Sequence, residues 1–323
     1  MDRQERIQLF TAFETKPLAE LRETVRRLEE AGLDGVFVSD HLFARTQGKR
    51  SRTEAAAFGF EPLTYLATIG AYSDRLTIGT TVMNCAWIHP AHLLRSFAQL
   101  ASLFGGDRVL AGLGAGWHRE EFEALALPMP PLSERMQALE TACALARRLY
   151  DDRTATIPGV ADDLPLSPPV DVPPRVLLGG GSERLLDLAG RYADVLDLRA
   201  PPKLAPGVTY PPYLGLIATV EDAEASVQRM AEAAKEVGRP RPILSVEIEW
   251  LRFCRMSEVA DVEADVCRRY GIEERDLRRS PFVLIGDAAR MRDLLAERRE
   301  RLGIDLLTVP ETVVERVRAE VLL

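Results

Sequence analysis

Residues 76–114 read LTIGTTVMNCAWIHPAHLLRSFAQLASLFGGDRVLAGLG, and this stretch decides the fold class. Apolar runs from Leu76 and from Val109 enclose a helical segment that opens at Pro90. Proline is favoured in the first turn of a helix, where its missing N–H is not needed. Nearly continuous apolar runs are typical of parallel strands that are buried on both faces. The stretch therefore predicts a strand–helix–strand unit with parallel strands.

The same alternation continues outward in both directions. Further short strands begin at Ile7, Gly35, Arg175, Asp194, Ile243 and Asp305. About eight strand–helix units predict an α/β fold, a TIM-like (β/α)8 barrel. A doubly wound open sheet is the alternative. We expect a single domain over residues 1–323, with Pro-rich loop insertions at about 151–174 and 199–220.

Composition limits the classes of function. Apolar residues make up 46% of the chain and charged residues 28%, which is the profile of a globular protein with a large core. The net charge of −8 argues against nucleic acid as a partner, because phosphate binding needs a basic face. No apolar run reaches the ~18 residues of a membrane helix, and the start, MDRQERIQLF, lacks the apolar stretch of a secretory signal. The four cysteines form no CxxC pair, so we expect a cytoplasmic protein without disulfides.

All four histidines follow predicted strand ends, which is where a barrel places its chemistry. Asp40 and His41 close the strand that begins at Gly35, so we predict that His41 is a catalytic acid or base with Asp40 beside it. A structural histidine bonded to a neighbouring strand end is the alternative. His89 and His92 have the spacing of metal ligands, but no third ligand is near them, so we expect no metal.

Two glycine-rich strand ends are candidate ligand sites. The segment GLGAGWH gives the backbone room to approach a flat ligand, and Trp117 and His118 would line a substrate pocket there. The second segment consists of Gly179, Gly180, Gly181 and Ser182. It precedes a helix and predicts a phosphate site, because free N–H groups at a helix start bind anions. Tight turns without a ligand are the alternative for both segments.

Two further loops have features of ligand contacts. One loop carries four basic residues, Arg45, Lys49, Arg50 and Arg52. It is either a solvated surface loop or a partner for an anionic cofactor tail or substrate. The other loop carries Tyr210 and Tyr213 among prolines, and it is either a stiff lid over the substrate or a surface connector.

Taken in order, these motifs resemble those of the bacterial luciferase-like superfamily, and within it the deazaflavin (F420)-dependent oxidoreductases. The resemblance rests on LEEAGLDGVFVSDHLF, on residues 76–114 followed by AGWHREEFEALALP, on PPRVLLGGGSERLLDLAGRYADV and on SPFVLIGD. It implies a TIM-like barrel that binds FMN or F420 at its C-terminal mouth, and the SDH wording favours F420.

The resemblance also implies roles for individual residues. Asp40 and His41 match the acid–His pair that faces the deazaflavin ring. Thr81 and Val82 match the position of a non-prolyl cis peptide behind that ring, and we expect them to bind the cofactor together with Asn84. The residues from Gly179 to Ser182 match the phosphate-binding turn. Sugar-phosphate dehydrogenases of the group carry a glutamate where this chain has Trp117, and this departure argues against their activity.

The expected function is hydride transfer between reduced F420 and a C=C, C=N or carbonyl group of a small or apolar substrate. His41 would donate or accept the proton. A luciferase-like monooxygenase that uses reduced FMN and O2 is the alternative, and a non-catalytic flavin-binding barrel is the second. The substrate is expected to be a small molecule or a modified peptide, and the resemblance to the family suggests a homodimer.

Overall fold

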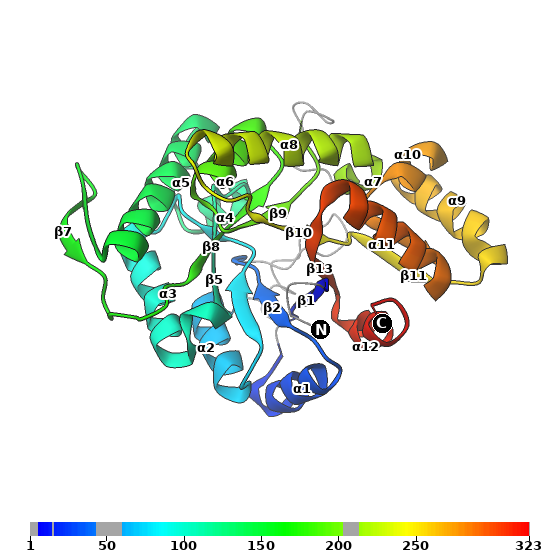
Figure 1. Cartoon of the computed structure of the whole chain (residues 1–323), viewed down its shortest axis with the longest axis horizontal. Coiled ribbons are helices and arrows are strands. Elements are labelled where there is room, and N and C mark those ends of the chain that lie inside the picture. The colour runs from blue at the N-terminus through cyan, green and yellow to red at the C-terminus, as the bar shows by residue number, and fades with distance from the viewer. Residues whose placement is uncertain (1–5, 15, 43–59, 203–212, 323) are drawn as a thin grey trace.

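The computed structural model describes residues 6–14, 16–42, 60–202 and 213–322. Its centre is a closed barrel of parallel strands, in which each barrel strand pairs with the next one along the chain (Figure 1). The barrel strands are β1 (Gln8–Ala12), β2 (Gly35–Val38), β3 (Thr77–Thr80), β5 (Val109–Gly114), β8 (Arg175–Gly180), β9 (Val195–Leu198), β10 (Ile243–Glu247) and β13 (Ile304–Pro310). Pairing of β13 with β1 closes the ring. The predicted TIM-like barrel is confirmed, and the open sheet is wrong.

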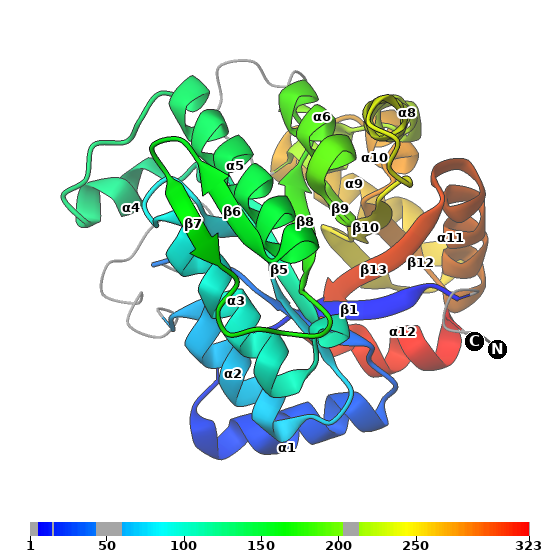
Figure 2. The same cartoon turned by 60° about the vertical axis from the view of Figure 1, so that its left-hand side comes forward.

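A helix follows each barrel strand and lies on the outside of the barrel (Figure 2). These helices are α1 (Leu18–Glu30), α2 (Pro62–Tyr72), α3 (Pro90–Phe104), α5 (Leu132–Arg147), α6 (Glu183–Tyr192), α8 (Val220–Glu236), α11 (Ala288–Leu302) and α12 (Val314–Glu320). Their starts are set by local chemistry. Pro90 opens α3 as the sequence predicts, and Asp287 caps α11 by accepting a hydrogen bond from the Arg290 N–H at 2.9 Å.

The barrel strands bury side chains on both of their faces. One set of side chains forms a cluster enclosed by the strands: Phe10, Phe37, Leu110, Leu177, Val195 and Leu306. The alternate set packs outward against the helices in the main core. This double burial is why the strands read as continuous apolar runs. It also leaves the loops at the strand ends as the place for polar chemistry.

Four further helices and five further strands lie in the described parts of the loops. They are α4 (Arg119–Ala124), α7 (Leu214–Ile217), α9 (Val259–Tyr270), α10 (Glu274–Arg279), β4 (Met83–Asn84), β6 (Thr154–Ile157), β7 (Ala161–Pro165), β11 (Trp250–Phe253) and β12 (Val283–Gly286). Strands β6 and β7 form an antiparallel hairpin inside the first predicted insertion. The segment SPFVLIGD contributes β12, which pairs with β11 in a separate two-stranded sheet. The second insertion contains α7, and its residues 203–212 lie outside the described residues.

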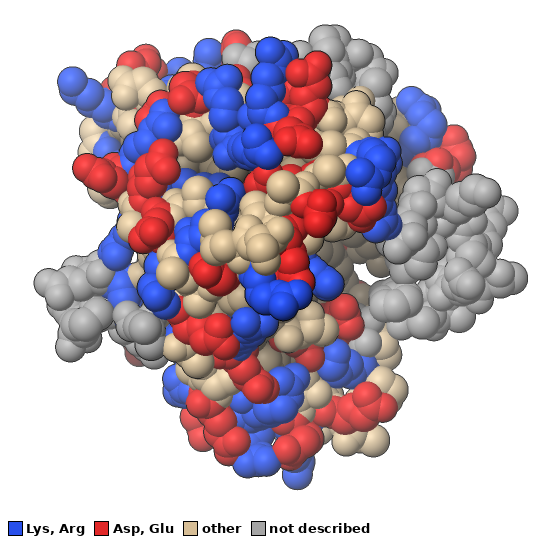
Figure 3. Space-filling view, turned by 90° about the vertical axis from the view of Figure 1, so that its right-hand side faces the viewer, with Lys and Arg blue, Asp and Glu red and all other residues tan. Residues whose placement is uncertain are grey.

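Charged side chains of both signs are mixed on the surface of the molecule. Figure 3 shows basic and acidic side chains interspersed over one face of the molecule. Ion pairs between neighbouring helices contribute to this mixture, for example Arg301 of α11 with Glu224 of α8 at 2.8 Å.

The four cysteines are free thiols. Within the described ranges, no helix has both the length and the apolar character that a membrane crossing needs.

Candidate active site

A cavity of about 80 Å³ opens at the C-terminal ends of β2, β3 and β5. It is lined by Asp40, His41, Thr81, Val82, Asn84, Gly116, Trp117, His118 and Glu121. The structure thus brings together two groups of predicted residues that are far apart in the chain. The Asp40–His41 pair meets the Trp117–His118 pair across the cavity, beside the segment that begins at Thr81. Glu121 is the one charged lining residue that the sequence analysis did not single out.

Asp40 links β2 to the segment that follows β3. Its Oδ2 accepts a hydrogen bond from the backbone N–H of Asn84 at 3.0 Å, and Asn84 Oδ1 accepts one from the N–H of Ala86 at 3.0 Å. Burial raises the pKa of the Asp40 carboxyl, although the Asn84 N–H and the nearby His41 act in the opposite direction. Asp40 therefore holds the cavity wall in place and faces the cavity as a carboxyl with weakened acidity.

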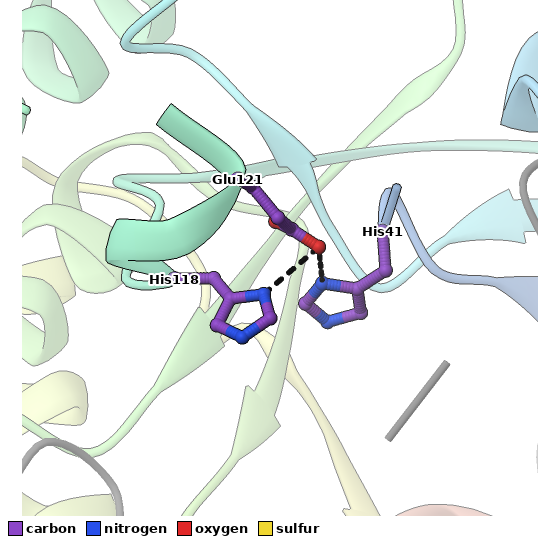
Figure 4. A group of neighbouring side chains, drawn as sticks. All are labelled: His41, His118 and Glu121. Carbon is purple, nitrogen blue, oxygen red and sulfur yellow. Dashed lines mark hydrogen bonds and ion pairs between the residues drawn. The ribbon is translucent and has the colours of Figure 1, made fainter. Parts of the chain in front are cut away.

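Glu121 is the shared partner of the two histidines in the cavity (Figure 4). Its Oε1 lies 3.0 Å from His41 Nδ1 and also accepts the backbone N–H of Leu42 at 3.0 Å. Burial would raise the pKa of the Glu121 carboxyl, but the hydrogen bond to His41 and the closeness of both imidazoles together outweigh burial and lower it. An ionised carboxylate can only accept, so Nδ1 of His41 carries the proton and Nε2 is free to exchange one.

His118 is buried on the other side of Glu121. Its Nδ1 lies 2.9 Å from Glu121 Oε1, and its Nε2 lies 3.6 Å from Glu120 Oε2. The short Nδ1 contact does not have hydrogen-bond geometry, and among the described residues this buried atom has no hydrogen-bond partner. The Trp117 ring packs against both imidazoles, at 4.8 Å from His118 and 5.8 Å from His41 between ring centroids. Trp117 therefore faces the histidines, and its contact with a substrate stays a prediction.

The peptide bond between Thr81 and Val82 is cis, as the resemblance implied. Val82 projects toward the glycines of the neighbouring strands. A Cβ at Gly114 would overlap Val82 Cγ2, and one at Gly112 would overlap the carbonyl oxygen of Thr80. The glycines of GLGAGWH thus accommodate the protein's own β3 and Val82. The interpretation that their backbone also approaches a flat ligand stays a prediction.

The predicted phosphate turn lies between β8 and α6. Ser182 caps α6 by accepting a hydrogen bond from the Leu185 N–H at 3.4 Å. Gly181 and Ser182 line a second cavity, of about 340 Å³, together with Pro201 and Arg229. Gly179, at the end of β8, lies next to the wall of the first cavity, since a Cβ on it would lie 3.1 Å from Val82 Cγ1. Gly180 has φ +152°, a conformation that L side chains rarely adopt.

The remaining predicted site residues either lie elsewhere in the structure or fall outside the described residues. Tyr213 is half-buried and packs against an apolar cluster that includes Leu216 and Val259. Tyr210 and the basic residues Arg45, Lys49, Arg50 and Arg52 lie outside the described residues. His89 is the N-cap of α3, where its Nδ1 accepts the Ala91 N–H at 3.3 Å.

Glu121 could have been found from the sequence. It stands three residues after His118 at the start of α4, so helical spacing places the two side chains on one face. His41 lies 80 residues earlier in the chain, and only the tertiary structure brings it to the same carboxylate. The expectation that this strand end lacks an acid beside the reacting groups is therefore wrong. The resemblance implies a glutamate at the position of Trp117 in sugar-phosphate dehydrogenases, and in this structure Glu121 of α4 supplies a carboxylate four residues later.

The chain belongs to the luciferase-like monooxygenase family, whose sequence profile matches residues 5–319. Among curated proteins it is similar to an F420-dependent glucose-6-phosphate dehydrogenase of Kribbella flavida, with 32% identity over 54% of this chain and 51% of that protein. A protein of the same description from Intrasporangium calvum is 34% identical over 43% of this chain and 40% of that protein. The chain thus spans about half the length of the curated relatives it matches.

Solved structures of the same fold cover nearly the whole chain. An F420-dependent secondary alcohol dehydrogenase in complex with an F420–acetone adduct superposes with a TM-score of 0.73 at 17% identity, over 98% of both chains. A monooxygenase from Streptomyces bottropensis superposes with a TM-score of 0.67 at 16% identity, over 97% of both chains. At these identities the likeness establishes the shared barrel and no more.

Proposed function

We propose that this chain is an F420-dependent oxidoreductase that transfers a hydride between the reduced deazaflavin and a C=C, C=N or carbonyl group of a small molecule. The observation that carries the proposal is the His41–Glu121 hydrogen bond of 3.0 Å inside the mouth of the barrel. It supplies a histidine held in one protonation pattern where the family binds its cofactor. The F420-dependent relatives from Kribbella and Intrasporangium favour F420 over FMN.

The residues present fit a phosphate-bearing deazaflavin. The 340 Å³ cavity at the start of α6 has the size of ligand pockets, which begin at roughly 300 Å³. It combines the Ser182 hydroxyl with the N–H groups of a helix N-terminus, a donor set suited to phosphate. Gly179, near the end of β8, lies beside Val82, whose peptide bond with Thr81 is cis. The 80 Å³ cavity beside His41 is too small for a tricyclic ring and suits the reacting atoms of a substrate.

In this mechanism the bound cofactor supplies hydride chemistry, and the protein supplies the proton. His41 exchanges it through Nε2, because Glu121 holds the Nδ1 proton. Asp40 keeps the cavity wall in place through the Asn84 N–H, and Trp117 restricts the space next to the imidazoles. We also propose a cytoplasmic location, which the four free thiols support, and a homodimer, as expected from the family.

Binding and turnover measurements test this proposal. The purified protein is titrated with F420 and, separately, with FMN, and cofactor fluorescence reports the dissociation constants at low and high salt. We expect tighter binding of F420, and reduction of F420 by an alcohol or oxidation of reduced F420 by an enone or imine. Tighter binding of FMN, with O2-dependent oxygenation of a substrate, would replace the proposal with the monooxygenase. Binding of either cofactor without any turnover would leave a non-catalytic barrel.

A further inference from the structure

Three side chains at the barrel mouth place metal-ligating atoms close together. One nitrogen each of His41 and His118 and one carboxylate oxygen of Glu121 all lie within 4.8 Å of one another (Figure 4). His41 comes from the loop after β2, whereas His118 and Glu121 belong to the start of α4. Imidazole nitrogen and carboxylate oxygen are ligands of Zn²⁺ and related ions. The sequence did not suggest this set, because two distant segments form it.

We propose that His41, His118 and Glu121 bind a single divalent transition-metal ion of the Zn²⁺ class. Three protein ligands leave one position of a tetrahedral ion open for water, as in zinc sites that are not purely structural. The cavity of about 80 Å³ beside these residues provides the space for that water.

His118 provides the second, independent observation. Its side chain is only 5% exposed, yet its Nδ1 has no hydrogen-bond partner among the described residues. A buried polar atom without a partner costs free energy, so native structures rarely retain one without a reason. The atom lies 2.9 Å from Glu121 Oε1 but outside hydrogen-bond geometry, which is the spacing of two ligands that share an ion. A bound metal ion would satisfy His118 and Glu121 together.

Charge and protons balance for this ion. Glu121 contributes one carboxylate oxygen to the set. Each histidine contributes a neutral imidazole nitrogen, so the proton on His41 Nδ1 moves to Nε2 when Nδ1 binds the ion, and an imidazole that is protonated at both nitrogens must first release one proton to solvent. Metal affinity therefore falls as the pH falls. One Glu121 carboxylate leaves the site with a net charge of +1 from these groups, and the Asp40 carboxyl lines the same cavity.

The ion inhibits the proposed reaction. It would replace the Nδ1 proton that fixes the protonation pattern of His41, and it would fill the cavity that the reacting atoms of the substrate need. This consequence depends on the proposed function, whereas metal binding itself does not. His89 and His92 make a matched internal comparison, since their rings lie 6.1 Å apart and His89 Nδ1 is engaged in capping α3.

The test is a titration of the full-length protein with Co²⁺, followed by its visible absorption, and then competition with Zn²⁺. We expect saturable binding of one ion. His118→Asn, Glu121→Gln and His41→Gln should each weaken it at least about tenfold, since even residues that only support a metal ligand are worth that much. The double variant His89→Asn/His92→Gln should bind like the wild type. Circular dichroism and thermal melting without metal show which variants keep the fold, and His41, the most exposed ligand, provides the variant least expected to disturb it.

Two results would overturn the proposal: no saturable one-to-one binding by the wild type, or binding by the folded triad variants that matches the wild type. The same protein is titrated with F420 in the absence of metal, so a failed cofactor experiment leaves the Co²⁺ result intact. If F420 turnover is found, Zn²⁺ should suppress it in the wild type over the concentration range in which it displaces Co²⁺. Turnover that persists with the ion bound would refute the inhibitory role.

Discussion

The carboxylate of Glu121 lies 3.0 Å from Nδ1 of His41, although 80 residues separate the two in the chain. His41 follows strand β2, and Glu121 lies in α4, which follows β5. The closed barrel therefore brings the two residues together. A second histidine, His118, contacts the same oxygen. One buried carboxylate therefore lies beside two imidazole rings. Glu121 is therefore the residue that links the two histidines.

His41→Ala should lower turnover at least about tenfold, the low side of general acid–base contributions. The side chain is 31% exposed, so its removal should leave the fold and cofactor affinity nearly unchanged. Steady-state kinetics and cofactor titration of the variant check this, with His89→Asn as the control at a helix cap. Unchanged turnover would remove His41 from the mechanism, and an unfolded variant would show that the residue is structural.

Glu121→Gln should change the pH dependence of stability. The pKa of Glu121 lies below its ordinary 4.5 in the folded protein, because the hydrogen bond from His41 and the closeness of both imidazoles together outweigh burial. The unfolded chain therefore binds this proton more tightly, so ionised Glu121 stabilises the fold above about pH 4.5 and this stabilisation disappears as the pH falls through the folded pKa. Urea unfolding of both proteins across pH should show a difference that is large at neutral pH and shrinks in acid.

The exposed neighbour Glu120 provides the control for that experiment. Glu120→Gln should follow the wild-type profile closely, because a surface ion pair contributes only about 0–1 kcal/mol. If Glu121→Gln kept a constant offset from the wild type at all pH values, the ionised carboxylate would not be the stabilising species.

All eight barrel strands could be predicted from the sequence, because burial on both faces leaves a continuous apolar run at each one. The limits of the method appear at β12, Val283–Gly286, which has the same character but pairs with β11 outside the barrel. Local sequence does not encode that choice of partner. The hairpin of β6 and β7 was likewise read only as an insertion, since its exposed strands lack a clear alternation.

The candidate site was predictable wherever a strand end fixes direction. Asp40, His41, Trp117 and His118 all reach one cavity for that reason. The packing role of Gly112 and Gly114 was missed, because their neighbours Thr80 and Val82 come from an earlier segment of the chain. Glu121 was missed as a partner of His41 because their contact depends on the relative placement of β2 and α4.

Ser182→Asp should weaken cofactor binding without weakening the fold. Aspartate caps a helix about as well as serine, and the helix dipole favours its charge. The same charge would repel a phosphate bound in the adjoining cavity. Fluorescence titration should show a sharp loss of F420 affinity for Ser182→Asp and little change for the neutral cap Ser182→Asn. Equal losses in both would point to geometry instead of charge. A substitution at Gly180 would be a poorer test, because its φ of +152° adds strain.

Trp117→Ala should change substrate selection more than stability. The indole is only partly buried and packs on His41 and His118, so its loss should cost less than the ~3–5 kcal/mol of a fully buried aromatic residue. We expect a higher KM or an altered preference among substrates, and Trp117→Phe should keep most of the wild-type behaviour. A stability loss of several kcal/mol with unchanged KM would make Trp117 a core residue.

Asp40→Asn should leave the protein at least as stable as the wild type at neutral pH. Burial raises the pKa of Asp40 above its ordinary 3.8, so the folded state holds this proton more tightly than the unfolded chain. The ionised side chain therefore costs stability, and that cost grows as the pH rises from about 3.8 through the folded pKa. An asparagine keeps an oxygen that can accept the Asn84 N–H and avoids the buried charge.

Unfolding free energies measured against pH decide the point. The advantage of Asp40→Asn should be absent in strong acid, where the wild-type carboxyl is protonated, and should grow toward neutral pH. Asp40→Ala is the contrasting variant, because it leaves the Asn84 N–H without its acceptor at a cost of about 1–3 kcal/mol. If Asp40→Asn were instead destabilised at neutral pH as much as Asp40→Ala, the folded site would need the negative charge of Asp40, and a cation in the mouth would have to be its partner.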